Sequence, residues 1–213
     1  MLELGLKITL AYALGSVMGG LVVGYVRGGV DLRRAGSGNP GGTNALRTQG
    51  AAFAFWVLLI DVGKGILAVA LIPRLMLPGV GADAEVEGEL LTYAVGFAAI
   101  VGHVFPLWFD FRGGKGGATA AGLLCYLAPA LAIPVLAAWL GVVFFTGFVG
   151  IATVSAALFA AVYVGVAELP EQQGLFVFAS LVGLLILYTH RGNLRRMMDG
   201  TESRFGRFFG LKR

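Results

Sequence analysis

Charged residues are scarce in this sequence: they make up 13% of its 213 residues, whereas 57% are hydrophobic. Soluble domains carry about 25% charged residues. A chain of this length cannot bury so much apolar surface in one core. The composition therefore excludes an ordinary soluble domain and predicts a polytopic membrane protein.

Cysteine and histidine are also scarce. The single cysteine, Cys125, excludes a framework of internal disulfides. Two histidines and one cysteine argue against a structural zinc site, which takes four such ligands. We therefore predict no metal ion and no cofactor.

Four apolar stretches have about the 20 residues that a membrane-crossing helix needs. They cover residues 4–26, 51–72, 90–109 and 174–189. The first lacks the basic start and the cleavage site of a signal peptide, so we expect it to be retained as a helix. A fifth apolar region, 118–167, is too long for one crossing.

Basic residues are unevenly distributed between the connecting segments. Segments 27–47, 110–118 and 191–213 hold 13 of the 16 Lys and Arg residues. Segments 73–89 and 168–173 together hold one arginine and six acidic residues. Because cytoplasmic loops are enriched in Lys and Arg, this pattern predicts an outside N-terminus and a cytoplasmic C-terminus.

This orientation requires region 118–167 to cross the membrane an odd number of times. One crossing would leave about thirty apolar residues without a place, whereas three short crossings use the whole region. We expect the breaks near Pro134 and at residues 146–150. The predicted fold is an all-α integral membrane protein, one polytopic domain over residues 1–213, with seven transmembrane helices. Five spans with a membrane-embedded hairpin are the alternative.

Three polar motifs interrupt the apolar pattern, all on the predicted cytoplasmic side. They read GSGNPGGTN at 36–44, FRGGKGGAT at 111–119 and HRGNLRR at 190–196. Because each lies at the end of a predicted span, the three can converge on one site.

The first motif has the composition of an anion site. Consecutive glycines let successive backbone N–H groups point into one concavity. Thr43 or Asn44 can cap a helix that starts at Ala45, and the N-terminus of a helix favours anions. Arg47 follows one turn later.

The second motif surrounds one lysine with glycines. In this setting Lys115 can act as a phosphate-binding cation. A Walker A loop is excluded, because Gly116 follows the lysine and no strand precedes it. Together with Arg47 and Arg191, the motifs predict a ligand that carries phosphate.

Five further polar residues lie in or beside apolar spans. His190 and Asn193 are three residues apart, so in a continuing helix they would face the same side, with His190 as an acid, base or donor. Asp61 and Lys64 have the same spacing inside a span. For them we expect a salt bridge that braces a polar cavity. We expect His103, just before a proline, to brace a helix break.

In order and spacing, the stretches GSGNPGGTN, GHVFPLWFDFRGGKGGAT and HRGNLRRMMDGTESRFG resemble the three signature motifs of the bacterial acyl-phosphate:glycerol-3-phosphate acyltransferases of the PlsY type. The resemblance covers essentially the whole chain, including DVGKG at 61–65. It implies a seven-helix enzyme of the bacterial inner (plasma) membrane with its site at the cytoplasmic face. It also implies acyl transfer from acyl phosphate to the 1-hydroxyl of glycerol 3-phosphate, giving lysophosphatidate and phosphate in the first acylation step of phospholipid synthesis.

The resemblance also assigns residues to roles. Catalysis is implied for Ser37, Lys115, His190 and Asn193. Substrate binding is expected for Gly36, Gly38, Asn39, Thr43, Asn44, Arg47, Gly113, Gly114, Gly116 and Thr153. One departure concerns the family's serine-containing YVSLAS stretch, where this chain reads FVGIAT at 148–153. There Gly150 cannot supply a hydroxyl, whereas Thr153 can.

Acyl phosphate is an activated anhydride, so no enzyme nucleophile is required. Lys115, Ser37 and backbone N–H groups would stabilise the charge that develops during transfer. Either His190 or the substrate's own phosphate would take the hydroxyl proton, and both options stay open.

A phosphate or organophosphate transporter is the alternative function, favoured only by the charges of Asp61 and Lys64. Transporter sites lie near the midplane and often come with internal repeats, whereas the three motifs lie on one face. The basic tail 195–213 predicts contact with membrane lipids. No nucleic-acid partner is predicted, and the oligomeric state is undetermined.

Overall fold

The computed structural model describes residues 1–205, which fall into two compact units divided after Leu127. The described residues form helices and turns, without a β-strand. The single-domain assignment of the whole chain stays a prediction.

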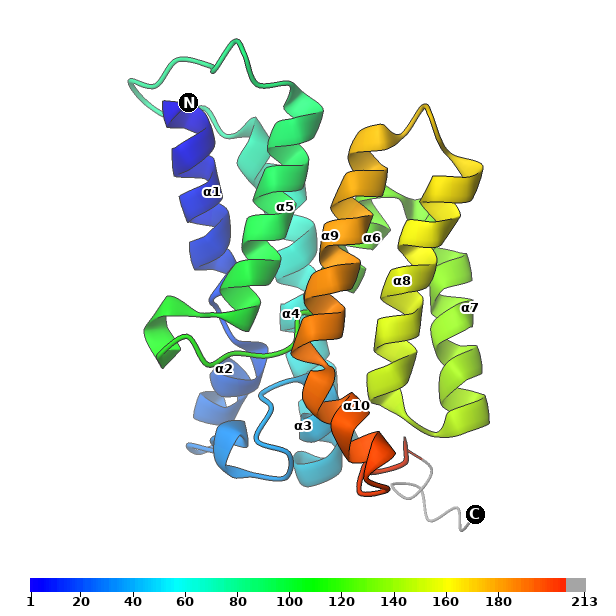
Figure 1. The fold of residues 1–213 in the computed structure, drawn as a ribbon. Coiled ribbons are helices and arrows are strands. Elements are labelled where there is room, and N and C mark those ends of the chain that lie inside the picture. The colour runs from blue at the N-terminus through cyan, green and yellow to red at the C-terminus, as the bar shows by residue number, and fades with distance from the viewer. Residues whose placement is uncertain (206–213) are drawn as a thin grey trace. The chain divides into compact units, whose positions relative to one another are not determined.

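The first unit contains six α-helices and three short 3₁₀ turns. They are α1 (Leu2–Gly15), α2 (Gly19–Val26), η1 (Leu32–Arg34), α3 (Gly42–Gln49), α4 (Ala51–Leu71), η2 (Ile72–Arg74), α5 (Gly88–Val104), η3 (Leu107–Phe109) and α6 (Gly117–Leu127). Helix α1 packs along α5, and α4 packs against α6 (Figure 1). Helices α2 and α3 both pack against α4.

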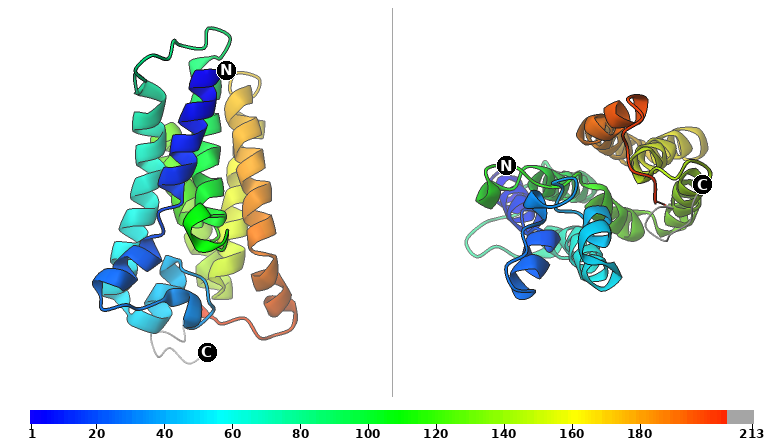
Figure 2. Two further views of the ribbon diagram at one scale, coloured as in Figure 1. Left: turned by 90° about the vertical axis from the view of Figure 1, so that its left-hand side faces the viewer. Right: turned by 90° about the horizontal axis from the view of Figure 1, so that it is seen from below.

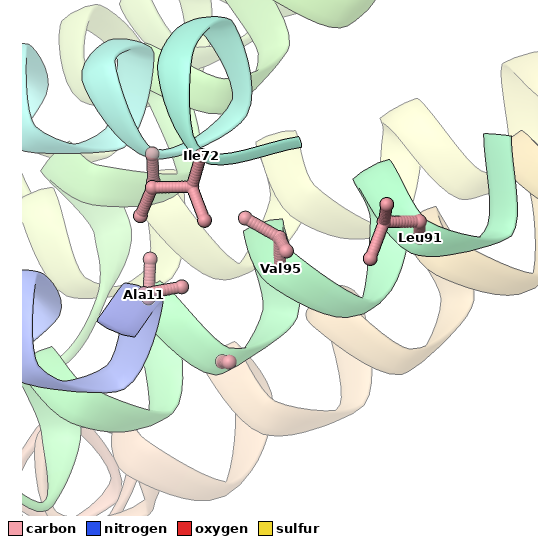
Figure 3. Close-up of a cluster of buried hydrophobic side chains, with 7 residues drawn as sticks. Ala11, Ile72, Leu91 and Val95 are labelled. Carbon is pink, nitrogen blue, oxygen red and sulfur yellow. The ribbon is translucent and has the colours of Figure 1, made fainter. Parts of the chain in front are cut away.

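A cluster of buried hydrophobic side chains joins three helices of this unit. Ala11 of α1 lies beside Ile72 of η2, and Leu91 and Val95 of α5 complete the labelled group (Figure 3). Burial of such side chains holds α1, α5 and the end of α4 together.

Helices α4 and α6 approach each other at glycines. A Cβ atom on Gly65 would collide with the carbonyl oxygen of Thr119, and one on Gly122 would collide with that of Val62. Backbones can come this close only where the side chain is absent. The short α6 is thereby fixed against the middle of α4.

The second unit contains four helices: α7 (Pro129–Thr146), α8 (Val149–Ala167), α9 (Gln173–Thr189) and α10 (Arg191–Met198). Helix α8 packs against both α7 and α9 (Figure 2). The chain bends by 51° between α9 and α10. Of the predicted lipid-contacting tail, residues 206–213 lie outside the described residues.

Several helices are long and apolar enough to cross a membrane. Four meet this condition alone, over Ala51–Arg74, Gly88–Phe109, Pro129–Thr146 and Val149–Ala167, and two bent pairs raise the number to six. Helix α6 is also apolar, but its 11 residues reach only about 16 Å. The chain is therefore an all-helical, multi-pass membrane protein, while seven crossings and the orientation of the termini stay predictions.

The long apolar region divides into α6, α7 and α8. The break predicted at residues 146–150 is confirmed, since α7 ends at Thr146 and α8 begins at Val149. The break predicted near Pro134 is wrong, because the chain breaks at Ala128. A residue before proline disfavours the helical conformation, and Ala128 precedes Pro129. Pro134 lies inside α7 as its sixth residue, where it removes one backbone hydrogen bond without ending the helix.

Candidate active site

The first glycine-rich loop is organised by one buried side chain, that of Asn44 in the first turn of α3. Its Oδ1 accepts the Ser37 amide at 3.0 Å. Its Nδ2 donates to the carbonyl oxygens of Leu32 at 3.2 Å and Ala35 at 2.9 Å. These three hydrogen bonds hold the chain from η1 to Ser37 in one conformation.

Helix α3 begins earlier than the sequence indicated. Its first residue is Gly42, and Gly41 is the N-cap without a side-chain hydrogen bond, so the predicted start at Ala45 with Thr43 or Asn44 as cap is wrong. The reason is that Asn44 turns its side chain back into the loop. Within the described residues, the amides of Gly42 and Thr43 have no acceptor. Two N–H donors thus lie at the start of this helix.

The second glycine-rich loop folds back onto the end of α5. The Gly113 amide donates to the Val104 carbonyl at 3.1 Å, and the Gly114 amide donates to the His103 carbonyl at 3.0 Å. These two amides are therefore not available to an anion bound at this loop. Gly114 is needed for close approach instead, because a Cβ atom there would collide with the imidazole of His103.

A buried ionic network lies beside this loop. Lys64 Nζ is 3.0 Å from Asp61 Oδ1, 2.8 Å from His103 Nδ1 and 2.6 Å from the carbonyl oxygen of Val17. At most 3% of any of the three side chains is exposed. Asp61 Oδ1 also accepts the Gly19 amide at 3.2 Å.

This network explains why the first apolar stretch is not one helix. Helices α1 and α2 bend by 46° between Gly15 and Gly19. A bend frees backbone groups that water cannot reach inside a membrane, so they need protein partners. Lys64 and Asp61 supply partners for Val17 and Gly19.

The two loops are connected through this first unit. Helix α2 starts at the network and packs on the first loop, since a Cβ atom on Gly20 would collide with the Pro40 carbonyl. The guanidinium of Arg33 in η1 lies over the ring of Phe109 in η3, 5.4 Å from its centre. The sequence-predicted residues of the first two motifs and the buried charges thus belong to one assembly.

Asp31 and Arg33 form an ion pair at the first loop. Arg33 Nη2 lies 2.9 Å from Asp31 Oδ2, and the Arg33 amide donates to Oδ1 at 3.0 Å. These hydrogen bonds from Arg33 favour the ionised carboxylate and lower the pKa of Asp31 below its ordinary value. Asp31 thereby caps η1, which leads into the first loop.

In the second unit, His190 occupies the bend between α9 and α10 and is buried. Its Nδ1 lies 2.8 Å from the carbonyl oxygen of Ile186. A carbonyl oxygen only accepts, so Nδ1 carries the proton, and the neutral ring has its lone pair on Nε2. Helix α9 ends at Thr189 and α10 begins at Arg191, so His190 and Asn193 do not lie in one continuing helix. The Asn193 amide instead donates to the His190 carbonyl at 2.8 Å.

Asn193 is held by a residue that the sequence analysis missed. Its Nδ2 donates to Glu202 Oε1 at 2.7 Å, and Arg196 Nε donates to the other carboxylate oxygen at 2.7 Å. The sequence feature that could have pointed to Glu202 is its carboxylate within a mostly basic segment. Gly150 packs on the same asparagine, because a Cβ atom there would lie 2.8 Å from Asn193 Cβ.

Thr153 lies between α7 and α8. Its hydroxyl donates to the Val149 carbonyl at 2.9 Å and accepts from Trp139 Nε1 at 3.1 Å. Its one donor is thus used within the helix, and the substrate contact expected for Thr153 stays a prediction.

Comparisons with known proteins agree with one another. Residues 6–200 match the family model described as glycerol-3-phosphate acyltransferase. A curated protein of that name from Methylococcus capsulatus is 40% identical over 206 residues, covering 94% of this chain and 96% of that protein. Another from Chlorobium phaeobacteroides is 34% identical over 233 residues, covering 97% of this chain and 99% of that protein.

Two crystal structures of PlsY (YgiH), an integral membrane glycerol 3-phosphate acyltransferase, are also similar. The glycerol 3-phosphate form gives a TM-score of 0.81 at 32% identity and covers 99% of both chains. The lysophosphatidic acid form gives 0.79 at 30% identity, covering 98% of this chain and 99% of that one. The fold and its polar loops define an all-helical integral membrane protein of the PlsY type. The chain belongs to the glycerol-3-phosphate acyltransferase family.

Proposed function

We propose that this protein transfers a fatty acyl group from acyl phosphate to the 1-hydroxyl of glycerol 3-phosphate. The hydroxyl oxygen bonds to the acyl carbon, the bond from that carbon to the phosphate oxygen breaks, and lysophosphatidate and phosphate result. The observation that carries the proposal is the attachment of two glycine-rich loops to one buried network, in a chain of this family.

Both substrates carry phosphate, and the first unit offers suitable groups for binding it. The amides of Gly42 and Thr43 start a helix whose dipole favours anions, and Arg47 follows on the same helix. Ser37 is positioned in the first loop through its own amide. Lys115 adds a cation in the second loop.

The transfer needs no enzyme nucleophile. Acyl phosphate already has a good leaving group, so the hydroxyl can attack the acyl carbon directly. Lys115 and Ser37 would stabilise the charge that develops on the carbonyl oxygen and the departing phosphate. Gly36, Gly38 and Gly116 would let the loop backbones approach the substrates closely, and the Asn39 amide would add a hydrogen-bonding group.

We assign the general base to His190. In its favour, the hydrogen bond from Nδ1 to Ile186 leaves the lone pair of the neutral ring on Nε2, the form that can take a proton. Asn193 fixes the bend through its bond to the His190 carbonyl. If the substrate's phosphate is the base instead, His190→Ala will keep most of the turnover and raise only KM.

We further propose that the acyl chain lies in the bilayer and that the site opens at the cytoplasmic face of the inner membrane. The excess of Lys and Arg in the three motif-bearing segments supports this orientation. Cysteines introduced singly at Arg34, Arg112 and Arg195 would all be labelled from the cytoplasmic side. Labelling of one of them from outside would contradict the shared site.

The decisive experiment uses purified protein, radiolabelled glycerol 3-phosphate and synthetic acyl phosphate. We expect lysophosphatidate to form, and we expect none when acyl-CoA replaces acyl phosphate. Lys115→Met should lower kcat/KM about 100-fold, whereas Arg34→Met, which removes an exposed cation, should leave it unchanged. Uptake of glycerol 3-phosphate into vesicles without acyl phosphate, in the absence of product formation, would instead indicate a transporter.

A further inference from the structure

The imidazole of His103 holds a defined orientation between a lysine and a phosphate-type loop. Its Nδ1 faces Lys64 Nζ at 2.8 Å. Its Nε2 lies against Gly114, where a Cβ atom would collide with it. The two ring nitrogens therefore have different surroundings, and their hydrogen-bonding roles can be assigned.

Lys64 determines which nitrogen carries the proton. An ammonium group has three N–H donors and no acceptor. Lys64 Nζ has three acceptors in reach: the Val17 carbonyl, Asp61 Oδ1 and His103 Nδ1. Nδ1 must then accept, so the neutral ring carries its proton on Nε2. A doubly protonated ring would place a second cationic donor against the ammonium.

Among the described residues, no hydrogen bond from His103 Nε2 is formed, and this atom keeps some accessible surface, unlike Asp61 Oδ2 and Thr119 Oγ1, which are buried without a partner. A donor with accessible surface can bond to water or to a ligand that enters beside Gly114. The loop beside it has already used the amides of Gly113 and Gly114 on α5. The imidazole of His103 is thus a hydrogen-bond donor that lies beside this part of the loop.

We propose that His103 Nε2–H donates a hydrogen bond to a phosphoryl oxygen bound at the second glycine-rich loop, and that Lys64 and Asp61 are positioning residues that fix this tautomer. The inference rests on the proposed function, which supplies the phosphoryl group. That group belongs either to glycerol 3-phosphate or to acyl phosphate, and kinetics distinguish the two sources. The intramembrane charges thereby act in substrate binding through His103.

Nitrogen-15 NMR of the histidine-labelled protein tests the tautomer directly. The chain has two histidines, and the structure assigns them opposite tautomers: Nε2–H for His103 and Nδ1–H for His190. A His190→Gln sample assigns the signals. We expect inorganic phosphate to shift the His103 Nε2–H signal. An Nδ1–H tautomer at His103, or a signal that phosphate does not move, overturns the inference.

A pair of variants tests the donor. Glutamine can place an amide N–H near the position of Nε2, whereas the shorter asparagine cannot. His103→Asn should raise KM for one of the two substrates about tenfold or more with little change in kcat, and His103→Gln should keep KM within about threefold. Equal losses in both variants, or equal increases for both substrates, contradict a specific hydrogen bond. Thermal unfolding reports whether each variant is folded. If neither variant folds, the NMR spectra of the wild type alone decide whether the inference holds.

A charge-neutral double variant tests the positioning residues. Asp61→Asn with Lys64→Met removes the pair together and avoids a lone buried charge. We expect the His103 tautomer to become mixed and KM for the same substrate to rise. An unchanged tautomer would refute the role of Lys64.

If the wild type forms lysophosphatidate but lacks the Nε2–H tautomer, only this inference fails. If it forms none, the proposed function fails, and the phosphate response still decides whether His103 binds an anion.

Discussion

The side-chain oxygen of Asn44 accepts the backbone amide of Ser37 at 3.0 Å, and its amide nitrogen donates to two further carbonyl oxygens of the preceding loop. Only 2% of Asn44 is exposed. A residue expected to contact substrate thus uses its polar atoms to shape the loop that carries Ser37. A structural role for Asn44 and a direct role make different predictions.

Asn44→Ala should destabilise the protein and impair catalysis together. Loss of three hydrogen bonds with partners left buried lowers the free energy of unfolding by about 1–3 kcal/mol. Thermal unfolding in detergent and steady-state kinetics measure both effects. Thr48→Val is the matched control, because it removes a hydroxyl of the same helix that bonds only the Asn44 carbonyl. An Asn44→Ala protein with unchanged stability but little activity would mean that Asn44 acts on substrate directly.

Gly65→Ala should separate α4 from α6. The added methyl would overlap the Thr119 carbonyl, and overpacking costs about 1–3 kcal/mol. Gly63→Ala, two residues earlier on the same helix, meets nothing within 4 Å and should be neutral or slightly stabilising. A lower unfolding temperature for Gly65→Ala alone is the expected result. Equal changes in the two variants would exclude a close helix crossing at Gly65.

The sequence predicts most helices because each apolar run is a local property. The positions of α4, α5 and α9 follow from length and hydropathy within a few residues. The bend between α1 and α2 could not be predicted in this way, because it depends on Asp61 and Lys64, more than forty residues away. The misplaced break at Pro134 shows that a proline alone does not determine where a helix ends, because the chain breaks at Ala128, before Pro129, whereas α7 continues through Pro134.

The motifs of the candidate site are visible in the sequence, but their internal partners are not. Glycine, lysine and histidine in these patterns indicate phosphate chemistry. The hydrogen-bond partners of the loop amides cannot be predicted from the sequence. Nothing in GGKGG indicates that the amides of Gly113 and Gly114 donate to carbonyl oxygens of α5. Likewise, the contact of Asn193 with Glu202 requires the chain to turn back after α10.

Glu202→Ala should lower turnover through Asn193. The carboxylate accepts from both Asn193 and Arg196, so its removal takes away the acceptor of the Asn193 side-chain amide. We expect kcat to fall about tenfold, the loss that corresponds to about 1.4 kcal/mol in the barrier. Glu202→Gln retains one acceptor and should lose less. Glu171→Ala, at an exposed position between α8 and α9, is the control and should behave as wild type. A Glu202→Ala enzyme with wild-type kinetics would show that Asn193 needs no such support.

Acidification should remove the stabilisation that the Asp31–Arg33 ion pair provides before the first glycine-rich loop. Arg33 lowers the pKa of this carboxyl in the folded protein. The unfolded value is about 3.9, so the pair stabilises the fold above that pH and loses its contribution as the pH falls through the lower, folded value. The pair is partly exposed and contributes about 0–1 kcal/mol.

The difference in unfolding temperature between wild type and Arg33→Met, measured in detergent at several pH values, isolates this contribution. Above about pH 5 we expect a constant difference, because Asp31 is ionised in both states. Towards pH 3 and below, the difference should shrink to the pH-independent part that comes from the contact of Arg33 with Phe109. Arg34→Met is the control, since Arg34 Nε lies 3.9 Å from the same carboxylate and is largely exposed. A difference that grows on acidification would mean that Arg33 stabilises the protonated carboxyl, the opposite of what the hydrogen bonds require.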